Sequence, residues 1–225
     1  DLQACTARNI VAMNTPGQNS NAVAELAFGM MIYAARGGFD GKTGSELLGK
    51  SLGLHAFGAV GKCMARIAAG FGMKVYAFDP FVDKKIIAES GVTAVNTVEE
   101  LYSSCQYVSL HIPANDKTKN SIGEKLLSLM PGGAVLVNTA RKEVINETEL
   151  AALMEKRTDM KYLSDIATDN AELFAARFAG RYFFTPKKMG AQTEEANINS
   201  GVAAARQIVD FFATGNEKFR VNKPK

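Results

Sequence analysis

Residues 51–80 read SLGLHAFGAVGKCMARIAAGFGMKVYAFDP, and this stretch decides the fold class. The apolar run at 51–57 predicts a strand, and the spacing of apolar residues at 62–71 predicts a helix. A second strand is expected at 74–78, just before Pro80 stops regular structure. The order strand, helix, strand is typical of a parallel βαβ unit, because parallel neighbours need a crossover between them.

The same alternation continues through most of the chain. Further strands are expected at 107–111, 134–137, 162–164 and 182–185, and helices at 84–89, 98–105, 124–130, 147–156 and 171–178. About six strands separated by helices predict an α/β fold, namely a Rossmann-like, doubly wound parallel sheet with helices on both faces. Two long helices, at 20–35 and 193–214, flank this unit, and their apolar faces indicate core or subunit contacts. Residues 1–13 have no obvious partner within the chain.

Composition places the chain among globular proteins and excludes several classes. Of its 225 residues, 47% are hydrophobic and 22% charged, which is enough apolar surface for a sizeable core. A net charge of +3 is too small for a dedicated nucleic-acid binder, and no apolar run reaches the ~20 residues of a membrane span. Cys5, Cys63 and Cys105 lack metal-ligand spacing, so we expect no metal site and a reduced, cytoplasmic chain.

The turn after the first strand carries a nucleotide-binding pattern. Residues 56–61 (AFGAVG) fit G-x-G-x-x-G, with Ala56 at the first glycine. Gly58 would let the backbone approach a pyrophosphate, and Gly61 would let the helix pack closely on the strand. Ala56 can replace glycine only if its φ is negative. The candidates for the pyrophosphate, which would face the free N–H groups of the helix start, are Gly58, Ala59, Val60 and Gly61.

Asp79 ends the second strand, where these patterns place an acidic residue. Its carboxylate would accept hydrogen bonds from the adenosine ribose and would repel a 2′-phosphate, which predicts NAD rather than NADP. The alternative is a tight glycine turn with Asp79 as a capping residue.

Several other segments complete a wider pattern. They are 14–20 (NTPGQNS) with 23–25 (VAE), 110–113 (LHIP), 138–141 (NTAR), Asp165, 185–186 (TP) and 190–195 (GAQTEE). Together with the fingerprint, and in this order along nearly the whole chain, they resemble the D-isomer-specific 2-hydroxyacid dehydrogenases. Within that family the chain is most similar to short 3-phosphoglycerate dehydrogenases without a C-terminal regulatory domain.

The resemblance implies a domain organisation. Residues 1–15 would be the remnant of a substrate-binding domain, 16–192 the NAD-binding Rossmann domain, and 193–225 a helix and tail that pack back toward the substrate-binding domain. The rest of that second domain would precede Asp1, so we expect this chain to bind NADH but to turn over poorly. The family pattern and the apolar helices also imply a homodimer.

Arg141 is the first catalytic candidate. It follows an apolar strand, and ligands of parallel sheets gather at the carboxyl ends of the strands. A guanidinium there can hold a 2-keto carboxylate through paired hydrogen bonds and polarise the ketone, which is the role the resemblance implies. The alternative is a surface arginine paired with Glu143 or Glu147.

The resemblance also assigns residues to the nicotinamide half of the cofactor. Asp165 matches an aspartate near the nicotinamide amide, with a helix cap as the alternative. His111 matches a position of structural character and is interpreted as a core histidine at a strand end. The remaining residues expected on this side are Ile112, Pro113, Thr139, Ala140, Arg141 and Gly190.

The general acid–base departs from the family pattern. The family places a histidine after Thr-Pro and a glutamate on the preceding loop, whereas here 185–193 read TPKKMGAQT. Matching backward from Gly190 puts Lys188 at the histidine position, and matching forward puts Lys187 there; we prefer Lys188. The glutamate position falls within 166–170 (IATDN), which contains Asp169 but no glutamate. The catalytic candidates are therefore Arg141, Lys188 and Asp169.

These two changes are chemically coherent. A histidine needs a carboxylate to raise its pKa and fix its tautomer, whereas an ammonium is already protonated. To accept a proton during alcohol oxidation, Lys188 should have a lowered pKa, which burial beside Arg141 could provide. The alternative is a loss of catalysis, with Lys187 and Lys188 as exposed charges.

The resemblance thus implies NAD-dependent oxidation of 3-phospho-D-glycerate to 3-phosphohydroxypyruvate, the first step of L-serine biosynthesis. Arg141 would hold the carboxylate and Lys188 would take the hydroxyl proton. Two alternatives stay open. One is a reductase of another small 2-keto acid such as glyoxylate, hydroxypyruvate or pyruvate; the other is an NADH-sensing binding protein.

Overall fold

A seven-stranded sheet, parallel throughout, forms the centre of the computed structural model, which describes residues 1–222. Its strands are β1 (Ser51–His55), β2 (Lys74–Phe78), β3 (Thr93–Ala94), β4 (Tyr107–Leu110), β5 (Val135–Asn138), β6 (Lys161–Ser164) and β7 (Tyr182–Phe184). Their order across the sheet is β3-β2-β1-β4-β5-β6-β7. The chain therefore builds outward from β1 to one edge and then returns to the middle at β4. In such sheets ligands bind near this reversal, beyond the carboxyl ends of the strands.

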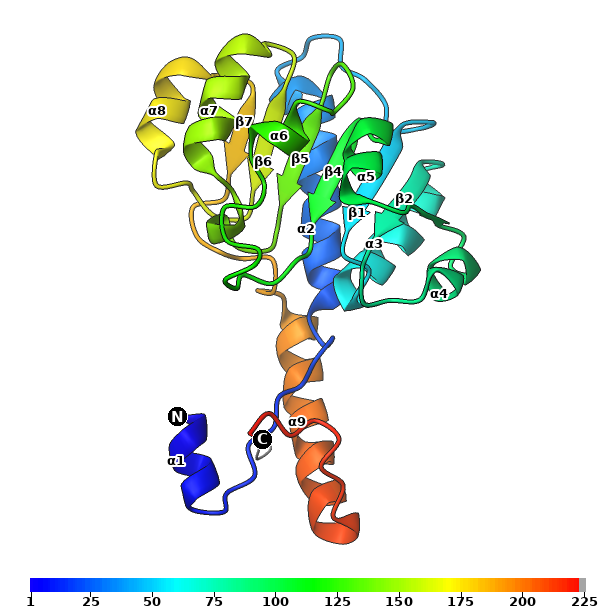
Figure 1. The fold of residues 1–225 in the computed structure, drawn as a ribbon, viewed down its shortest axis with the longest axis vertical. Helices are drawn as coiled ribbons and strands as arrows, with labels where there is room; N and C mark the ends of the chain where they lie inside the picture. Colours follow the sequence, from blue (N-terminus) through cyan, green and yellow to red (C-terminus); the bar gives the residue numbers. More distant parts are fainter. Residues whose placement is uncertain (223–225) are drawn as a thin grey trace.

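Helices cover both faces of the sheet, as the alternating pattern predicted (Figure 1). On one face, α2 (Ser20–Ala35) and α3 (Ala59–Gly70) share a buried cluster with the strands. The second cluster lies on the other face, where the helices are α5 (Val98–Ser104), α6 (Glu124–Leu127), α7 (Glu147–Lys156) and α8 (Ala171–Arg177). The short α4 (Lys84–Glu89) lies against β3, and the turns η1 (Gly37–Phe39) and η2 (Lys142–Val144) complete the body. The predicted α/β, doubly wound fold is confirmed.

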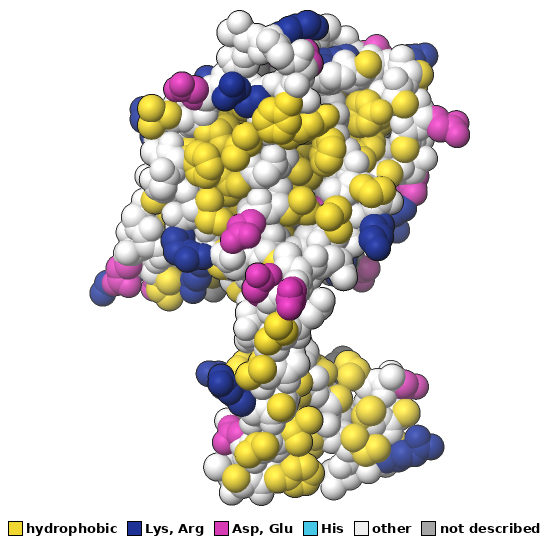
Figure 2. All heavy atoms as spheres, turned by 180° about the vertical axis from the view of Figure 1, so that it is seen from behind, with side chains coloured by type: hydrophobic (Ala, Val, Ile, Leu, Met, Phe, Trp, Pro, Cys, Tyr) yellow, Lys and Arg dark blue, Asp and Glu magenta, His cyan; other side chains and the backbone are white. Residues whose placement is uncertain are grey.

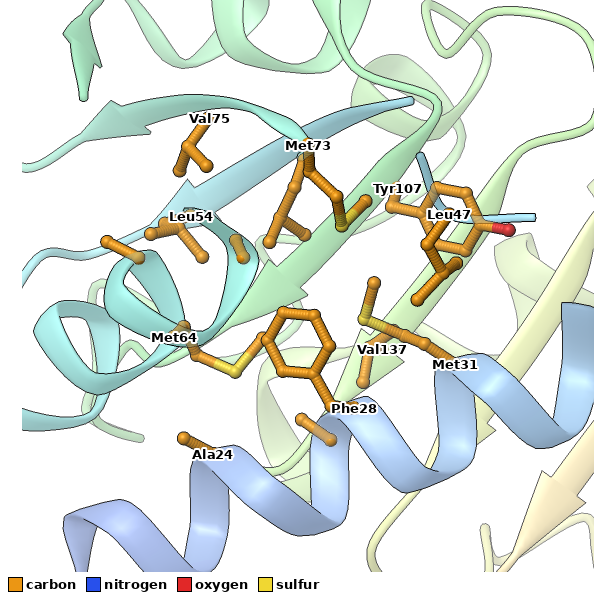
Figure 3. Packing of buried hydrophobic residues seen from close by; sticks show 14 of the residues in the cluster. Ala24, Phe28, Met31, Leu47, Leu54, Met64, Met73, Val75, Tyr107 and Val137 are labelled. Carbon is orange, nitrogen blue, oxygen red and sulfur yellow. The ribbon is translucent and has the colours of Figure 1, made fainter. Parts of the chain in front are cut away.

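The core explains why β4 and β5 have no polar face in the sequence. Both strands are buried along their whole length, because helices pack on each side of them. Figure 3 shows one of these faces, where Phe28 and Met31 of α2 point toward Leu54 of β1 and Val137 of β5. These side chains are at most 3% exposed, so α2 is a core helix on this side.

The long C-terminal helix α9 (Glu194–Thr214) leaves the body of the molecule and extends away from it (Figure 1). The hydroxyl of Thr193 caps its start by accepting a hydrogen bond from the N–H of Ala196, and Gly215, with a φ of 72°, ends it. Ala196 is its one buried residue. Within residues 1–222, no helix combines the length and apolarity that crossing a membrane requires.

The expectation that residues 1–13 lack a partner is wrong. This segment, which contains α1 (Leu2–Ala7), lies beside α9 and the C-terminal tail. Met13 forms an antiparallel bridge with Arg220. The buried Asn222 side chain donates to the carbonyl of Ile10 at 2.8 Å and accepts from the N–H of Ala12 at 3.0 Å. The division into 1–15, 16–192 and 193–225 stays a prediction, and its last three residues lie outside the described part.

Candidate active site

A cleft of about 710 Å³ opens beyond the carboxyl ends of β4, β5 and β6. The residues that line it are Asn19, Val23, Val60, His111, Ile112, Pro113, Ala114, Thr139, Ala140, Arg141, Asp165, Lys188, Ala191 and Gln192. The structure thus brings the candidates Val60, Ile112, Pro113, Thr139, Ala140, Arg141, Asp165 and Lys188 to one place. Asn19 and Gln192 also line the cleft, and although they stand in segments of the family pattern, their residue types alone do not indicate a role there.

The glycines of the fingerprint form an open helix start. Gly58 caps α3 without any side-chain hydrogen bond, so the first N–H groups of that helix are free to bind an anion. A Cβ at Gly58 would meet no atom within 4 Å, which means that a ligand can approach the backbone there. A Cβ at Gly61 would lie 2.6 Å from the carbonyl oxygen of Ala56, so only glycine lets α3 pack this closely on the turn.

Ala56 contradicts the condition set by the sequence pattern. Its φ is +87°, in the region that favours glycine, and not negative as expected. Alanine therefore occupies the conformation of the first glycine rather than avoiding it. The turn keeps the geometry of the pattern at the cost of backbone strain.

Asp79 holds the fingerprint turn against the end of β2. One carboxylate oxygen accepts from the N–H of Phe57 and the other from the N–H of Phe81, both at 2.8 Å. The capping role is therefore present in the structure. Each carboxylate oxygen has a second lone pair, so the group can accept hydrogen bonds from a ribose as well.

Arg141 stands on a loop that Asn138 fixes. The buried Asn138 side chain donates to the carbonyl of Arg141 at 2.9 Å and accepts from the N–H of Ala140 at 3.0 Å. The guanidinium donates to the carbonyl of Ala140 at 3.0 Å and is otherwise exposed at the cleft. Within residues 1–222 it makes no ion pair, so its charge is free to bind an anion. The role of Asn138 was missed, because a pattern of residue types does not show which side chain braces a loop.

Lys188 lines the cleft and Lys187 does not, although the side chains of both are exposed. The Lys188 amine donates to the carbonyls of Thr139 at 3.0 Å and Ala140 at 2.8 Å. Burial lowers the pKa of Lys188, and the charge of Arg141 acts in the same direction, although Asp165 and Glu143 oppose the shift. A lysine with a lowered pKa beside a free guanidinium is suited to proton transfer.

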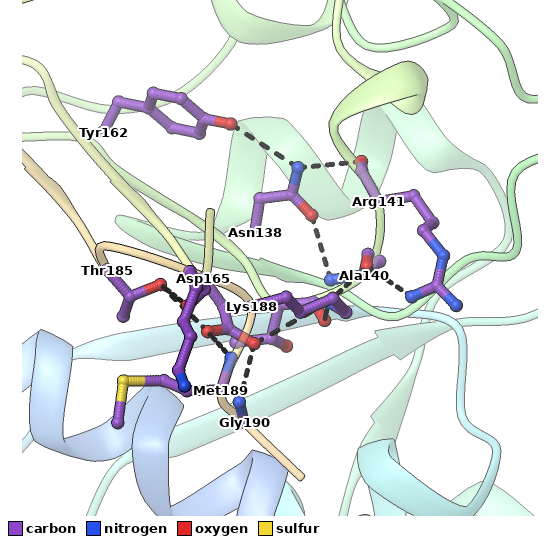
Figure 4. A network of polar contacts seen from close by, with 11 residues as sticks. Asn138, Ala140, Arg141, Tyr162, Asp165, Thr185, Lys188, Met189 and Gly190 are labelled. Atoms are coloured by element: carbon purple, nitrogen blue, oxygen red, sulfur yellow. Dashed lines mark hydrogen bonds and ion pairs between the residues drawn. The ribbon is translucent and has the colours of Figure 1, made fainter. Parts of the chain in front are cut away.

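Asp165 lies under the loop that carries Lys188 (Figure 4). It is 1% exposed, and its carboxylate accepts from the hydroxyl of Thr185 at 3.0 Å and from the N–H groups of Met189 and Gly190, each at 2.8 Å. A Cβ at Gly190 would lie 2.8 Å from this carboxylate, so glycine is needed for the approach. Gly190 itself is buried and does not line the cleft.

Asp169 is not brought together with Lys188. Its carboxylate pairs with Lys142 at 2.5 Å and is 75% exposed, and among the described residues it has no contact with Lys188. Glu147 holds the same loop by accepting from the N–H groups of Asp169 and Asn170. Position 169 therefore offers no carboxylate to the lysine in this structure.

The two histidines are neutral at ordinary pH. Burial lowers the pKa of His111 to about 3 and that of His55 to about 4. His111 lines the cleft, but its buried Nε2 has no hydrogen-bond partner among residues 1–222. The ring is not poised to exchange a proton near pH 7, in agreement with its interpretation as a strand-end histidine.

Comparisons with known proteins point to one family. A family model described as "D-isomer specific 2-hydroxyacid dehydrogenase, NAD binding domain" matches residues 17–177. D-3-phosphoglycerate dehydrogenase of Methanocaldococcus jannaschii is 33% identical over 226 residues, covering 92% of this chain and 42% of that protein. Hydroxypyruvate reductase of Thermotoga maritima is 36% identical over 163 residues, covering 67% of this chain and 52% of that protein.

A solved structure is also similar over the whole fold. The NAD⁺-bound 3-phosphoglycerate dehydrogenase of Entamoeba histolytica superposes with a TM-score of 0.89 at 48% identity. The match covers 99% of this chain and 71% of that chain. The present chain spans about half the length or less of the two curated relatives named above.

Proposed function

Because the chain belongs to the D-isomer-specific 2-hydroxyacid dehydrogenase family, we propose that it comes from an enzyme that oxidises 3-phospho-D-glycerate to 3-phosphohydroxypyruvate. The observation that carries the proposal is the convergence of Arg141 and Lys188 on one cleft. The similarity to dehydrogenases named for 3-phosphoglycerate supports this substrate.

NAD is the cofactor, since the matched region is the NAD-binding domain of the family. The residues fit it: the uncapped start of α3 at Gly58 would hold the pyrophosphate, and Asp79 would hold the adenosine ribose. Ile112, Pro113, Thr139 and Ala140 would line the nicotinamide side of the cleft. When bound, NAD supplies the acceptor for the hydride that leaves the substrate carbon.

The side chains of this chain supply binding and the proton transfer. Arg141 would pair with the substrate carboxylate and hold the hydroxyl-bearing carbon in place. The neutral amine of Lys188 would accept the hydroxyl proton as the C–H bond breaks and the carbonyl forms. The resulting ammonium is stabilised by the carbonyls of Thr139 and Ala140, which already accept from this group. In the reverse direction, the ammonium returns that proton to the carbonyl oxygen of the keto acid.

The first test is NADH oxidation with phosphohydroxypyruvate by the full-length protein and its Lys188→Ala variant. We expect kcat to fall at least about 100-fold, because a positioned acid–base is worth that much, while NADH still binds. Lys187→Ala is the matched control and should keep the parent rate. Equal rates in the parent and Lys188→Ala would contradict the role of Lys188. Running the 225-residue chain alongside tests the expected poor turnover of the chain alone.

A second candidate, reduction of another 2-keto acid, is favoured by the 36% identity to hydroxypyruvate reductase. Hydroxypyruvate, glyoxylate and pyruvate should be assayed beside phosphohydroxypyruvate. A higher kcat/KM for one of them would replace the phosphorylated substrate. Tight NADH binding without turnover of any acid would favour the NADH-sensing alternative.

We further propose that the protein is a homodimer that associates through an apolar patch on the α2 side of the sheet. Figure 2 shows apolar side chains gathered on this face. We define the patch by two neighbouring groups of side chains. The ring of Tyr33 contacts those of Phe39 and Phe183, and one hollow is lined by Ile32, Leu48 and Phe71. Phe39 and Leu48 are 66% and 67% exposed. The helix α2 carries a single charged residue, Glu25, and the hollow beside it is lined by the opposite charges of Arg36 and Glu46. A second copy of the same surface could therefore cover the apolar side chains while pairing these two charges across the contact.

A further inference from the structure

We propose that Asp165 is the positioning residue of Lys188: its buried carboxylate fixes both the backbone and the ammonium of the lysine for proton transfer. The loop at 166–170, where the family pattern places an acidic partner, does not supply this group. The inference rests on the proposed role of Lys188 as the acid–base.

The carboxylate of Asp165 accepts hydrogen bonds from loop residues on both sides of Lys188. One oxygen of Asp165 accepts from the hydroxyl of Thr185 and from the N–H of Met189, and the other accepts from the N–H of Gly190. Lys188 therefore stands between anchor points that share one carboxylate (Figure 4). Asp165 itself extends directly from the end of β6, so the loop is tied to the sheet.

The same carboxylate attracts the ammonium. The Lys188 Nζ lies 3.7 Å from the Asp165 oxygen, which is the one ion pair of Asp165 among residues 1–222. This distance is an ion-pair contact but is too long for a good hydrogen bond. The ammonium has three N–H groups, and the carbonyls of Thr139 and Ala140 take two of them. The third N–H stays available for a substrate oxygen.

Burial distinguishes Asp165 from the other nearby carboxylate. Asp165 is 1% exposed, whereas the carboxylate of Asp169 is 75% exposed and pairs with Lys142. A charge that is shielded from water acts more strongly on its neighbour. The buried carboxylate is therefore the one that can hold the charge and position of Lys188.

Four groups of contacts determine the pKa of Lys188, and they predict the direction in which it changes when Asp165 is replaced. Burial and the Arg141 charge lower the pKa of Lys188, and Asp165 and Glu143 raise it. Removing the Asp165 charge should therefore lower the pKa of Lys188 further. A carboxylate that only held the loop would leave that pKa unchanged.

The experiment measures the pKa of Lys188 by NMR after reductive ¹³C-methylation of the full-length protein, with Lys188→Arg to assign the signal. Asp165→Asn should lower this pKa, and the pH–rate midpoint should move to lower pH with it. The variant should also lose about 100-fold in kcat, because it removes one acceptor of the loop N–H groups and so loosens the alignment of the lysine without taking it out of the cleft. Thr185→Val is the matched control: it loosens the same loop but keeps the charge, so the pKa should stay at the parent value.

A second variant covers the case in which Asp165→Asn does not fold. In Lys188→Met the carboxylate loses its cation, and ¹³C NMR should show the pKa of Asp165 rising above its value in the parent. An unchanged Asp165 pKa in this variant, or an unchanged Lys188 pKa in a folded Asp165→Asn protein, overturns the proposal.

Neither NMR measurement depends on turnover. Coupled pKa values in a protein that turns over no acid would support the pair and reject the proposed function. Loss of activity in Lys188→Ala with uncoupled pKa values would reject the pair and leave the function standing.

Discussion

The backbone at Ala56 adopts a φ of +87°, which burdens an L-residue with about 1–2 kcal/mol of strain that glycine does not carry. This residue stands immediately before the uncapped start of α3, in the turn expected to face the pyrophosphate. Strain of this kind persists where the surrounding structure determines the backbone. Here α3 packs so closely on the turn that a Cβ added at Gly61 would lie 2.6 Å from the carbonyl oxygen of Ala56.

Ala56→Gly should therefore stabilise the protein. The free energy of unfolding should rise by about 0.5–1 kcal/mol, which is the strain relieved less the extra freedom of glycine in the unfolded chain. Urea unfolding followed by circular dichroism measures the change. Ala69→Gly, an exposed site inside α3, is the control and should lower stability by about 1 kcal/mol. Destabilisation by Ala56→Gly would show that the turn carries no such strain.

The two histidines give the fold a predictable sensitivity to acid. Their pKa values, about 3 for His111 and about 4 for His55, lie below the ~6.5 of an unfolded chain. Their contribution to stability is complete above about pH 6.5 and is lost as the pH falls toward 4 and 3, because only the unfolded state takes up protons in that window. The free energy of unfolding should drop by up to ~1 kcal/mol per pH unit per histidine below about pH 6.

Urea unfolding at about pH 7.5, 6 and 5 measures this slope above the range in which most carboxylates titrate. His111→Gln should make the slope shallower. The same slope in the parent and the variant would show that His111 titrates normally in the folded state.

At the scale of elements, the hydrogen bonds of Asn222 to Ile10 and Ala12 join the C-terminal tail to the N-terminal segment. Asn222→Ala removes hydrogen bonds to Ile10 and Ala12, each worth about 0.5–1.5 kcal/mol net. Amide exchange in residues 6–13 should accelerate about tenfold or more, while the melting temperature of the sheet stays the same. Hydrogen exchange with mass spectrometry resolves the two regions. Asn216→Ala, on the exposed part of the same tail, should leave residues 6–13 protected.

The helices and strands also show which parts of the fold can be predicted from the sequence. Alternating strand and helix patterns predicted β2, α2, α4 and α7 with their observed bounds. In β2, α2 and α7 the pattern follows a buried face, whereas the short α4 buries only Ile87. The two-residue β3 was missed, since two residues carry no period. The partner of residues 1–13 was missed for a different reason: a single asparagine, Asn222, supplies contacts that no repeating pattern encodes.

In the site, too, the sequence indicated some residues and missed others. Matching back from Gly190 favoured Lys188 over Lys187, and in the structure Lys188 lines the cleft while Gly190 fixes the local backbone by its close approach to Asp165. The sequence pointed to Asp169 for the acidic partner, but in the structure that carboxylate pairs with Lys142. The hold of Asp165 on the loop depends on backbone N–H groups, which every residue but proline has, so no pattern of side chains could indicate it.

The whole molecule offers one test of the proposed association. Leu48→Asp puts a charge within the apolar patch on the α2 side and should shift sedimentation equilibrium from dimer to monomer. Phe81→Asp is the matched control, because Phe81 is 95% exposed but lies outside this patch, and its variant should sediment like the parent. A parent protein that sediments as a monomer would exclude the homodimer.

The acceptors that hold the Lys188 amine are main-chain oxygens at the end of β5. An oxygen of this kind is present whatever side chain the gene encodes at positions 139 and 140. Substitutions at these two positions can therefore change the side chains that line the cleft without removing the carbonyl oxygens that accept hydrogen bonds from Lys188. Under the proposed mechanism, the nicotinamide side of the cleft can change in the course of descent while both acceptors of the Lys188 amine are kept.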